Sequence, residues 1–360
     1  MSAKLKAGVI GLGMGGGHLS GYLSHPDVEV VAIADRREDR RALLPDRWPE
    51  FKGKVYTEGI EMIKNEKLDI LSVAVPNDQH NPLTIAGLEA GANVLCEKPM
   101  AMNAQEAQQM LDTAKRCGKK LGIDFSYRFN PQSRAMKAMI EEGALGNIYY
   151  ARSVWFRRAG IPGLAAANFN TGAGSPMGSW FFDKKQSGGG PLIDLGVHRL
   201  DLALWLMGYP TPVWVMASTY SKFGPKWAKA QGLDYTVEDL ACAMIKFDNG
   251  TTLELDASWA CNIKEKELQT IRLLGDKGGM YQFNLEEGYT YDVEYYSQIA
   301  GRDFDSRMHT AQPMPSAFHL FVDAVRDDKP FLVRPEEGVT VMKILDAIYK
   351  SAATGEPVRV

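Results

Sequence analysis

The feature that most constrains this chain is a glycine-rich turn between two short apolar segments near its start. Residues 6–10 predict a first strand, which runs directly into Gly11-Leu12-Gly13-Met14-Gly15-Gly16. Residues 28–34 are largely apolar, as expected of a buried strand in a parallel sheet. Strand, glycine turn, helix and strand in this order are typical of a βαβ unit that binds a dinucleotide at the turn.

Each residue of this turn has an expected task. Gly11 permits the tight turn, Gly13 lets a pyrophosphate approach the backbone, and Gly16 lets the following helix pack closely on the strand. The helix that begins near Met14 directs its first N–H groups at the phosphates. Asp35 ends the second strand, where its carboxylate is expected to accept a hydrogen bond from a ribose hydroxyl.

The choice between NAD and NADP depends on neighbouring charges. Asp35 favours NAD, because a carboxylate repels the 2′-phosphate of NADP. Arg36 and Arg37 follow at once, and an arginine can hold that phosphate. We expect NAD as the cofactor, with NADP as the alternative and Arg36 as a further cofactor contact.

Length, charge and cysteine usage limit the remaining alternatives. The 360 residues are too many for one average core and suit two domains. The net charge of −3 gives no sign of a nucleic-acid partner, and no apolar run is long enough to cross a bilayer. The sequence starts without signal-peptide features, and its four cysteines form no CxxC pair. We expect a cytoplasmic protein with reduced thiols and no membrane partner.

Residues 1–125 are predicted to form a Rossmann domain of the α/β class. Strands alternate with helices, which predicts a parallel sheet with right-handed crossovers. Asn103 and Glu106 fit the start of one helix, and Gly118 fits its end. Further predicted strands are residues 55–56, 70–75, 93–96 and 120–125, and predicted helices include residues 58–65 and 103–117.

Residues 126–360 are predicted to form a second domain of the α+β class. Consecutive extended segments with short turns indicate an antiparallel sheet, and residues 248–250 (Asp-Asn-Gly) are a strong hairpin signal. We expect this domain to bind substrate, and its C-terminal helix can pack back on the first domain. The predicted strands are residues 147–156, 213–223, 237–247, 251–261 and 267–274, and the predicted helices are residues 191–207, 316–327 and 335–353.

Polar side chains follow two strands at the carboxyl edge of the predicted parallel sheet, where ligands of such sheets bind. After residues 70–75, Pro76, Asn77 and His80 are expected contacts of the cofactor. Asn77 is equally suited to cap the next helix, and the two roles are compatible.

Glu97, Lys98 and Pro99 follow the strand at residues 93–96. A lysine beside a cationic nicotinamide ring can move a proton or donate to a substrate hydroxyl. Glu97 can accept from the cofactor ribose or hold the lysine, and Pro99 permits a cis peptide bond. The alternative is a solvated glutamate–lysine pair on the surface.

Asp194 and His198 lie four residues apart behind Gly188-Gly189-Gly190. On a helix they share one face and form a credible acid–base pair, because imidazole titrates near neutral pH. One alternative is a core histidine satisfied by a neighbouring acid. A metal site is the weaker alternative, and we expect none, because no third ligand is marked.

Together these motifs resemble the Gfo/Idh/MocA family, which includes glucose–fructose oxidoreductase and inositol dehydrogenase. The glycine turn, the Pro-Asn-x-x-His segment, Glu97-Lys98-Pro99 and the glycine-led helix stand in the family order over essentially the whole chain. The resemblance implies an N-terminal Rossmann domain and a C-terminal domain on a large open, mostly antiparallel sheet. It also implies oxidation or reduction of a sugar or polyol hydroxyl with NAD(H) or NADP(H).

The resemblance implies roles for individual residues as well. Carried over, His198 would take the hydroxyl proton, Asp194 would support it, and Lys98 would bind the same oxygen. Residues 127–131 look like the segment that closes the first domain, and Arg128 is expected to reach the active site. Many members pair their sheets, so we expect a homo-oligomer, a dimer or a tetramer.

Two further stretches are candidates for substrate contact. Arg157 and Arg158 follow a predicted strand, and Trp180 precedes the glycine-led helix. Guanidinium groups bind oxygens and an indole face stacks on sugar C–H groups, although a solvated basic pair and a core tryptophan are the alternatives. Residues 224–239 are predicted to be either a lid or an oligomer contact.

The sequence therefore predicts an NAD(P)-dependent dehydrogenase that transfers a hydride between nicotinamide and a secondary hydroxyl of a sugar, polyol or glycoside. A second hypothesis uses the same site for transient oxidation in elimination, epimerisation or glycoside cleavage, without net redox change. A third is a sensor that binds NAD(P) without turnover, because fold does not fix function.

Overall fold

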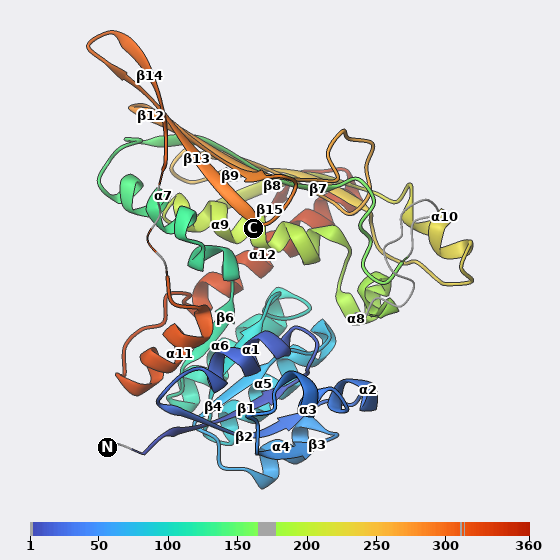
Figure 1. Ribbon diagram of the computed structural model, residues 1–360. Helices are drawn as coiled ribbons and strands as arrows, with labels where there is room; N and C mark the ends of the chain where they lie inside the picture. The colour runs from blue at the N-terminus through green and yellow to red at the C-terminus, as the bar shows by residue number, and fades with distance from the viewer. Residues whose placement is uncertain (1–2, 165–177, 310–311, 313) are drawn as a thin grey trace. The chain divides into compact units, whose positions relative to one another are not determined.

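The chain divides into two compact units (Figure 1). The first unit contains the chain up to Asp124 and also Pro315–Met342, and the second contains the rest. Residues 315–342 therefore do not belong with the expected domain 126–360. The reason is apolar packing, since Phe318 lies against Gly21 and Phe331 against Gly122. The computed structural model describes residues 3–164, 178–309, 312 and 314–360.

The first unit is built on a six-stranded parallel sheet with the order β3-β2-β1-β4-β5-β6. The order reverses between β1 and β4, and sheets of this kind bind ligands beyond the carboxyl ends of the strands at such a reversal. The predicted α/β class is confirmed. The strands are β1 (Leu5–Ile10), β2 (Val28–Ala34), β3 (Lys54–Tyr56), β4 (Ile70–Val73), β5 (Asn93–Glu97) and β6 (Leu121–Asp124).

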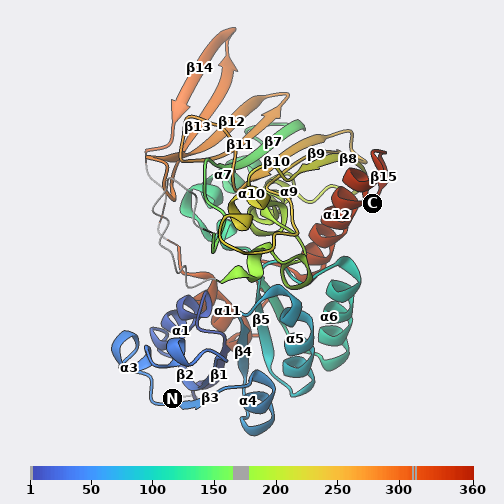
Figure 2. The same cartoon turned by 90° about the vertical axis from the view of Figure 1, so that its right-hand side faces the viewer.

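Helices cover both sides of this sheet, α1 and α11 on one and α5 and α6 on the other (Figure 2). Helix α6 begins and ends as its sequence predicts. The Asn103 side chain accepts from the backbone N–H of Glu106 at 2.9 Å, and Gly118 ends the helix at a left-handed φ of +62°. The helices are α1 (Gly15–Leu23), α2 (Glu38–Arg41), α3 (Leu44–Arg47), α4 (Gly59–Asn65), α5 (His80–Glu89), α6 (Ala104–Cys117), α11 (Ala317–Arg326) and the start of α12 (Pro335–Thr354).

The second unit is built on a nine-stranded sheet with the order β14-β13-β12-β11-β7-β10-β9-β8-β15. Only β7 and β10 run parallel among its described strands, so the sheet is mostly antiparallel, as predicted. The strands are β7 (Ile148–Arg157), β8 (Pro212–Tyr220), β9 (Leu240–Phe247), β10 (Thr252–Ser258), β11 (Glu267–Gly275), β12 (Gly278–Leu285), β13 (Thr290–Ile299), β14 (Arg302–Arg307) and β15 (Val358–Arg359).

The sequence did not predict strands β12, β13 and β14. Their residues combine aromatic and charged side chains without a clean alternation, and β14 is exposed along its whole length. β12 and β13 lie inside the sheet and bury Met280 and Val293, whereas β14 lies at its edge. The hairpin predicted at residues 248–250 is confirmed as the connection between β9 and β10.

Helices lie along one face of the nine-stranded sheet (Figure 1). The Ser153 hydroxyl of β7 donates to the backbone carbonyl of Arg199 in α9 at 3.0 Å, and the Gln282 amide of β12 donates to Ser133 in α7 at 3.2 Å. Every residue of α9 is buried, which makes this helix the centre of the unit. The helical segments are α7 (Pro131–Glu141), α8 (Lys184–Ser187), α9 (Val197–Leu206), α10 (Gly224–Lys229) and the end of α12. Across the described residues, no helix has the length and apolarity for crossing a bilayer.

A buried ion pair fastens α9 to the start of the second unit. Arg128 donates to Asp201 through two guanidinium nitrogens at 2.9 and 2.5 Å, and neither side chain is more than 1% exposed. The Tyr209 hydroxyl donates to the same carboxylate at 2.7 Å. The family resemblance leads us to expect Arg128 at the active site. In the structure this side chain has no exposed surface, and its ion pair with Asp201 holds α9 in place.

Replacing Asp201 with asparagine tests this brace. Asp201→Asn leaves a buried guanidinium without its counter-charge, so we expect the free energy of unfolding to fall by about 3–5 kcal/mol in urea titrations. Glu141→Gln is the control, because Glu141 pairs with Lys137 at 3.5 Å on the surface and should cost about 0.5 kcal/mol or less. Equal losses in the two variants would contradict this assignment.

Candidate functional site

The glycine turn of the first unit has the geometry of a dinucleotide site. Gly11 has a φ of +90°, and a Cβ atom there would lie 2.0 Å from the carbonyl oxygen of Ala74. Close packing of α1 on the sheet is made by Gly15, whose Cβ would lie 3.0 Å from that of Ala74. The prediction had given this task to Gly16, which instead faces Trp48. Met14 is exposed directly before the helix.

Asp35 is buried against this turn. Its carboxylate accepts from the backbone N–H of Leu12 at 2.6 Å and from that of Arg37 at 2.8 Å. Arg36 is 69% exposed and pairs with Glu58 at 3.0 Å. The glycine turn and the Asp35 carboxylate, which is expected to contact the ribose, are thus joined by a hydrogen bond. Bare glycine backbone, the first N–H groups of α1 and a carboxylate at the end of β2 fit a bound NAD.

The loop after β4 contains the predicted contacts Pro76, Asn77 and His80. Asn77 is buried and opens a short 3₁₀ turn, Asn77–Gln79. His80 has no exposed surface, and its ring nitrogens lie 2.7 Å from the carbonyl oxygen of Pro99 and 2.9 Å from that of Val75. Burial lowers the pKa of His80, although both hydrogen bonds oppose this. His80 thus fastens this loop to Pro99, and its expected contact with the cofactor stays a prediction.

Glu97 and Lys98 stand at the end of β5. The Glu97 side chain is buried, and its carboxylate accepts from the backbone N–H of Lys98 at 3.1 Å. Burial raises the pKa of Glu97, but the hydrogen bond from His18 and the charges of His18 and Lys98 outweigh it, so this pKa is lowered. The peptide bond between Lys98 and Pro99 is cis. This environment does not match a solvated surface pair.

Asp194 and His198 lie on two kinds of helix in the second unit. Asp194 belongs to a π-helical turn, Leu192–Gly196, and His198 to the first turn of α9. The sequence predicts one continuous helix here, and single π-turns are frequent at functional sites. Asp194 accepts from the indole N–H of Trp259 at 2.9 Å.

Aromatic rings surround His198. The imidazole is 9% exposed, and its ring centre lies 5.1 Å from that of Tyr127 and 5.9 Å from that of Trp155. Arg199 follows in the chain with no exposed surface, and its guanidinium lies 5.5 Å from the centre of the Tyr127 ring. Burial lowers the pKa of Arg199. This arginine is not among the predicted site residues, because its only signal in the sequence is a charge inside an apolar helix.

Glu238 caps the glycine-led turn, which is the start of the π-helical segment behind Gly188-Gly189-Gly190. The sequence did not predict this cap. Its carboxylate accepts from the backbone N–H of Gly190 at 3.0 Å and of Leu192 at 3.1 Å. The Tyr349 hydroxyl donates to it at 2.9 Å. Burial raises the pKa of Glu238 although these hydrogen bonds oppose it. Sequence reasoning missed this cap because Glu238 lies 48 residues from Gly190.

Among the predicted substrate contacts, Arg157 carries a charge that interacts with that of Asp194. It donates to Glu267 at 3.2 Å and to the Tyr289 hydroxyl at 2.9 Å. Burial lowers the pKa of Arg157, but the charges of Glu267 and Asp194 contribute to a net rise. Arg158 is exposed and donates to the backbone carbonyl of Lys264 at 3.5 Å.

The loops around the site are described in part. Trp180 is half-buried, with its ring centre 4.0 Å from that of Phe181. Residues 165–177, in a stretch rich in glycine, alanine and asparagine, lie outside the described residues. In the segment 224–239, Ala228 and Val237 are buried in one cluster with Leu195 and Trp259. Residues 224–239 therefore pack beside the π-helical turn that contains Leu195.

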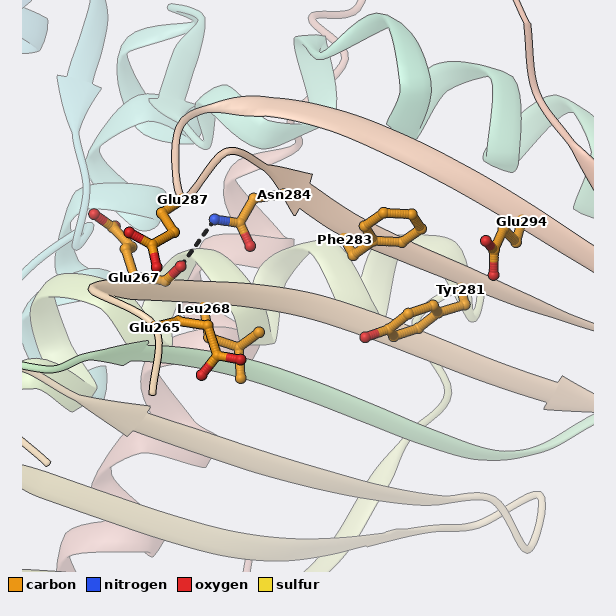
Figure 3. Close-up of a pocket in the computed structure, with 8 residues that line it drawn as sticks. All are labelled: Glu265, Glu267, Leu268, Tyr281, Phe283, Asn284, Glu287 and Glu294. Atoms are coloured by element: carbon orange, nitrogen blue, oxygen red, sulfur yellow. Dashed lines mark hydrogen bonds between the residues drawn. The ribbon is translucent and has the colours of Figure 1, made fainter. Parts of the chain in front are cut away.

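A pocket of about 300 Å³ lies on the sheet of the second unit (Figure 3). Tyr281 and Glu294 line it and belong to one cross-strand row with Arg152. Side chains alternate along a strand, and the neighbouring Ser153 bonds to α9, so this row faces away from the helices. The pocket is therefore not the place of His198. Its lining residues are Glu265, Glu267, Leu268, Tyr281, Phe283, Asn284, Glu287 and Glu294.

Comparison with known sequences finds relatives over the whole chain. Residues 5–125 match "Oxidoreductase family, NAD-binding Rossmann fold", and residues 133–281 match "GFO/IDH/MocA C-terminal domain". D-glucoside 3-dehydrogenase of Escherichia coli strain K12 is 31% identical over 361 residues, which cover 98% of this chain and 97% of the relative. Inositol 2-dehydrogenase of Rubrobacter xylanophilus is 31% identical over 169 residues, which cover 46% and 48%.

Solved structures share the fold. Levoglucosan dehydrogenase in complex with NADH superimposes with a TM-score of 0.83 at 24% identity, over 99% of both chains. A protein from gentamicin A biosynthesis in complex with NAD gives a TM-score of 0.76 at 26% identity, over 100% of this chain and 97% of the other. A Rossmann unit combined with a large, mostly antiparallel sheet is thus confirmed as the fold class.

The cap on the glycine-led turn can be tested through stability. Glu238→Gln leaves one acceptor oxygen where two backbone N–H groups need one each, so we expect a loss of about 1–3 kcal/mol in the free energy of unfolding. The measurement is a urea titration followed by tryptophan fluorescence. Glu142→Gln, at an exposed position of the same unit, is the matched control and should stay within about 0.5 kcal/mol of the parent. A Glu238→Gln variant as stable as the control would refute the capping role.

Proposed function

Because the chain belongs to the Gfo/Idh/MocA family of oxidoreductases, we propose that it is an NAD-dependent dehydrogenase acting on a secondary hydroxyl of a sugar, polyol or glycoside. The observation that carries this proposal is the set Lys98, Asp194 and His198 in a chain related over 98% of its length to D-glucoside 3-dehydrogenase. Glucosides are therefore the first substrates to try.

Lys98, Asp194 and His198 are proposed to act on one substrate hydroxyl. Bound NAD supplies the hydride acceptor. His198 takes the hydroxyl proton, and its aromatic surroundings keep water away from the imidazole. Asp194, fixed by Trp259, supports the charged imidazole, and Lys98 donates to the reacting oxygen.

Substrate contacts are proposed on the second unit. Arg157 presents a guanidinium beside Trp155, with 5.3 Å between the guanidinium carbon and the ring centre. A guanidinium suits a sugar because it binds oxygens, and the buried Trp155 ring supports the arginine from beneath. Arg158 and Trp180 remain further candidates. Asp194 and His198 would complete the pocket around the reacting carbon.

Cofactor contacts are proposed on the first unit. Gly11, Gly13 and the first turn of α1 would hold the pyrophosphate, and Asp35 the ribose. The nicotinamide end would meet Asn77 and Glu97, which are buried at the ends of neighbouring strands. His80 joins the loop after β4 to Pro99, and Pro76 and His80 stay proposed contacts of the cofactor.

The test of the reaction is NADH formation with a panel of glucosides, free sugars and cyclitols. Lys98→Met and His198→Ala are each expected to lower kcat by about 10²–10⁴-fold, because each removes a proton-handling group. Lys67→Met replaces an exposed lysine of the first unit and should match the parent. Unchanged turnover in Lys98→Met or His198→Ala would show that the assigned roles are wrong.

Other outcomes of the same panel separate the rival functions. Substrate conversion at catalytic NAD, without accumulating NADH, would favour transient oxidation in elimination, epimerisation or glycoside cleavage. Tight NAD(H) binding without turnover of any compound would favour a sensor.

Preference for NAD over NADP is a separate expectation. Asp35 places a carboxylate at the ribose end, while Arg36 and Arg37 are paired with Glu58 and Asp39. We expect at least about tenfold tighter binding of NAD, and a smaller ratio in Asp35→Ser, since about 1.4 kcal/mol of repulsion corresponds to a factor of ten. Fluorescence titrations with NADH and NADPH measure both constants. Asp46→Asn, an exposed carboxylate, should keep the parent ratio, and equal NADH and NADPH affinity in the parent would contradict the expectation.

Assembly and location complete the proposal. We propose a homo-oligomer that pairs the uncovered faces of the nine-stranded sheets, because Met244 on that face is 39% exposed beside Met216. Sedimentation velocity gives the oligomeric state. A cytoplasmic location is proposed from the four cysteines, all of which are free thiols.

A further inference from the structure

Four polar side chains from four elements meet inside the first unit, behind Lys98. His18 of α1 lies with its Nε2 atom 3.1 Å from the Glu97 carboxylate and 3.7 Å from the Asp124 carboxylate. Its Nδ1 atom lies 2.9 Å from the Ser72 hydroxyl. No member of this group is more than 9% exposed. One imidazole therefore joins the ends of strands β5 and β6.

Hydrogen bonds extend this group in both directions. The Tyr22 hydroxyl lies 2.7 Å from that of Ser72, and the Phe318 ring lies 4.4 Å from that of His18. At the other end, Glu97 accepts from the backbone N–H of Lys98 at 3.1 Å. Glu97 and Lys98 are predicted site residues, whereas the residues behind them carry no predicted role. The separation of 3.1 Å between His18 and Glu97 is that of a hydrogen bond, so a proton joins these two groups.

Asp124 differs from Glu97 although the two carboxylates are neighbours. One oxygen of Asp124 is buried without a hydrogen-bond partner among the described residues. Burial, followed by the negative charge of Glu97, raises the pKa of Asp124 to about 7. Glu97 keeps its charge because the hydrogen bond from His18 is directed at it. Of the two acids, Asp124 is therefore the one that binds and releases a proton near neutral pH.

We propose that Asp124 is a proton-binding positioning residue whose charge, passed through His18 and Glu97, sets the pH range in which Lys98 works. The kinetic part of this inference rests on the proposed function, whereas the proton site does not.

The direction of the effect follows from the charges. Below neutral pH Asp124 is protonated and neutral, and above it the carboxylate adds a negative charge that attracts the charge of Lys98. The other titratable groups facing these two carboxylates are His18 and Tyr22 on α1, Lys98 after β5, and His80 on α5. Removing the Asp124 carboxylate thus removes this attraction.

The first measurement needs neither substrate nor cofactor. The chain has six histidines, so the His18 ring signals can be assigned in NMR spectra by their loss in His18→Gln. In the parent protein these signals should shift in a step centred near pH 7, as Asp124 releases its proton. Asp124→Asn should abolish the step, and Asp112→Asn, at an exposed carboxylate of the same unit, should preserve it.

The second measurement is the pH profile of kcat/KM. The alkaline limb of Asp124→Asn should lie lower than that of the parent by about one pH unit. Asp112→Asn should reproduce the parent profile. Asp124→Glu keeps a carboxyl group, so its His18 step should survive with a displaced midpoint.

The outcomes separate the two ideas. A His18 step that persists in Asp124→Asn, or an unmoved midpoint in Asp124→Glu, overturns the proton site, and the second variant decides even if the first does not fold. Loss of the step with an unmoved pH profile overturns the link to Lys98. A parent protein that binds NAD but oxidises no sugar contradicts the proposed function, while the NMR measurement still decides on Asp124.

Discussion

Buried carboxylates that accept hydrogen bonds from backbone N–H groups fix the local geometry in both units. A carboxylate removed from water is costly unless donors surround it, so each such group ties together the segments that supply the donors. Asp35 joins the glycine turn to the end of β2, and Glu97 holds the backbone of Lys98. In the second unit, Glu238 caps the turn of Asp194. These three interactions place the groups on which the proposed chemistry depends.

The two proposed reacting regions are built in different ways. Around Glu97 the neighbours are titratable, so charge at that site responds to pH. Around His198 the neighbours are aromatic rings, which exclude water and fix the imidazole without titrating near neutral pH. A dehydrogenase needs both environments, because a polar site suits the charged nicotinamide and a dry one suits proton transfer from an alcohol.

Similarity to known proteins limits the possible reactions of this chain more than its fold does. Similar folds serve many reactions, whereas the likeness to D-glucoside 3-dehydrogenase extends over 97% of that relative. At 31% identity most positions differ between the two chains. Arg157, Arg158 and Trp180 are the proposed substrate contacts at which we expect substrate preference to be decided.

The sequence by itself determined the βαβ start, the strand ends that bear Glu97 and Lys98, the cap at Asn103 and the hairpin at residues 248–250. Each depends on local periodicity or on the conformational preferences of glycine and proline. Residues close together in the chain are enough to show these features. Only the tertiary structure decided that Glu238 caps a distant turn and that Asp124 meets His18. These contacts join residues far apart in the chain, and their cost or gain arises from burial, which no local pattern encodes.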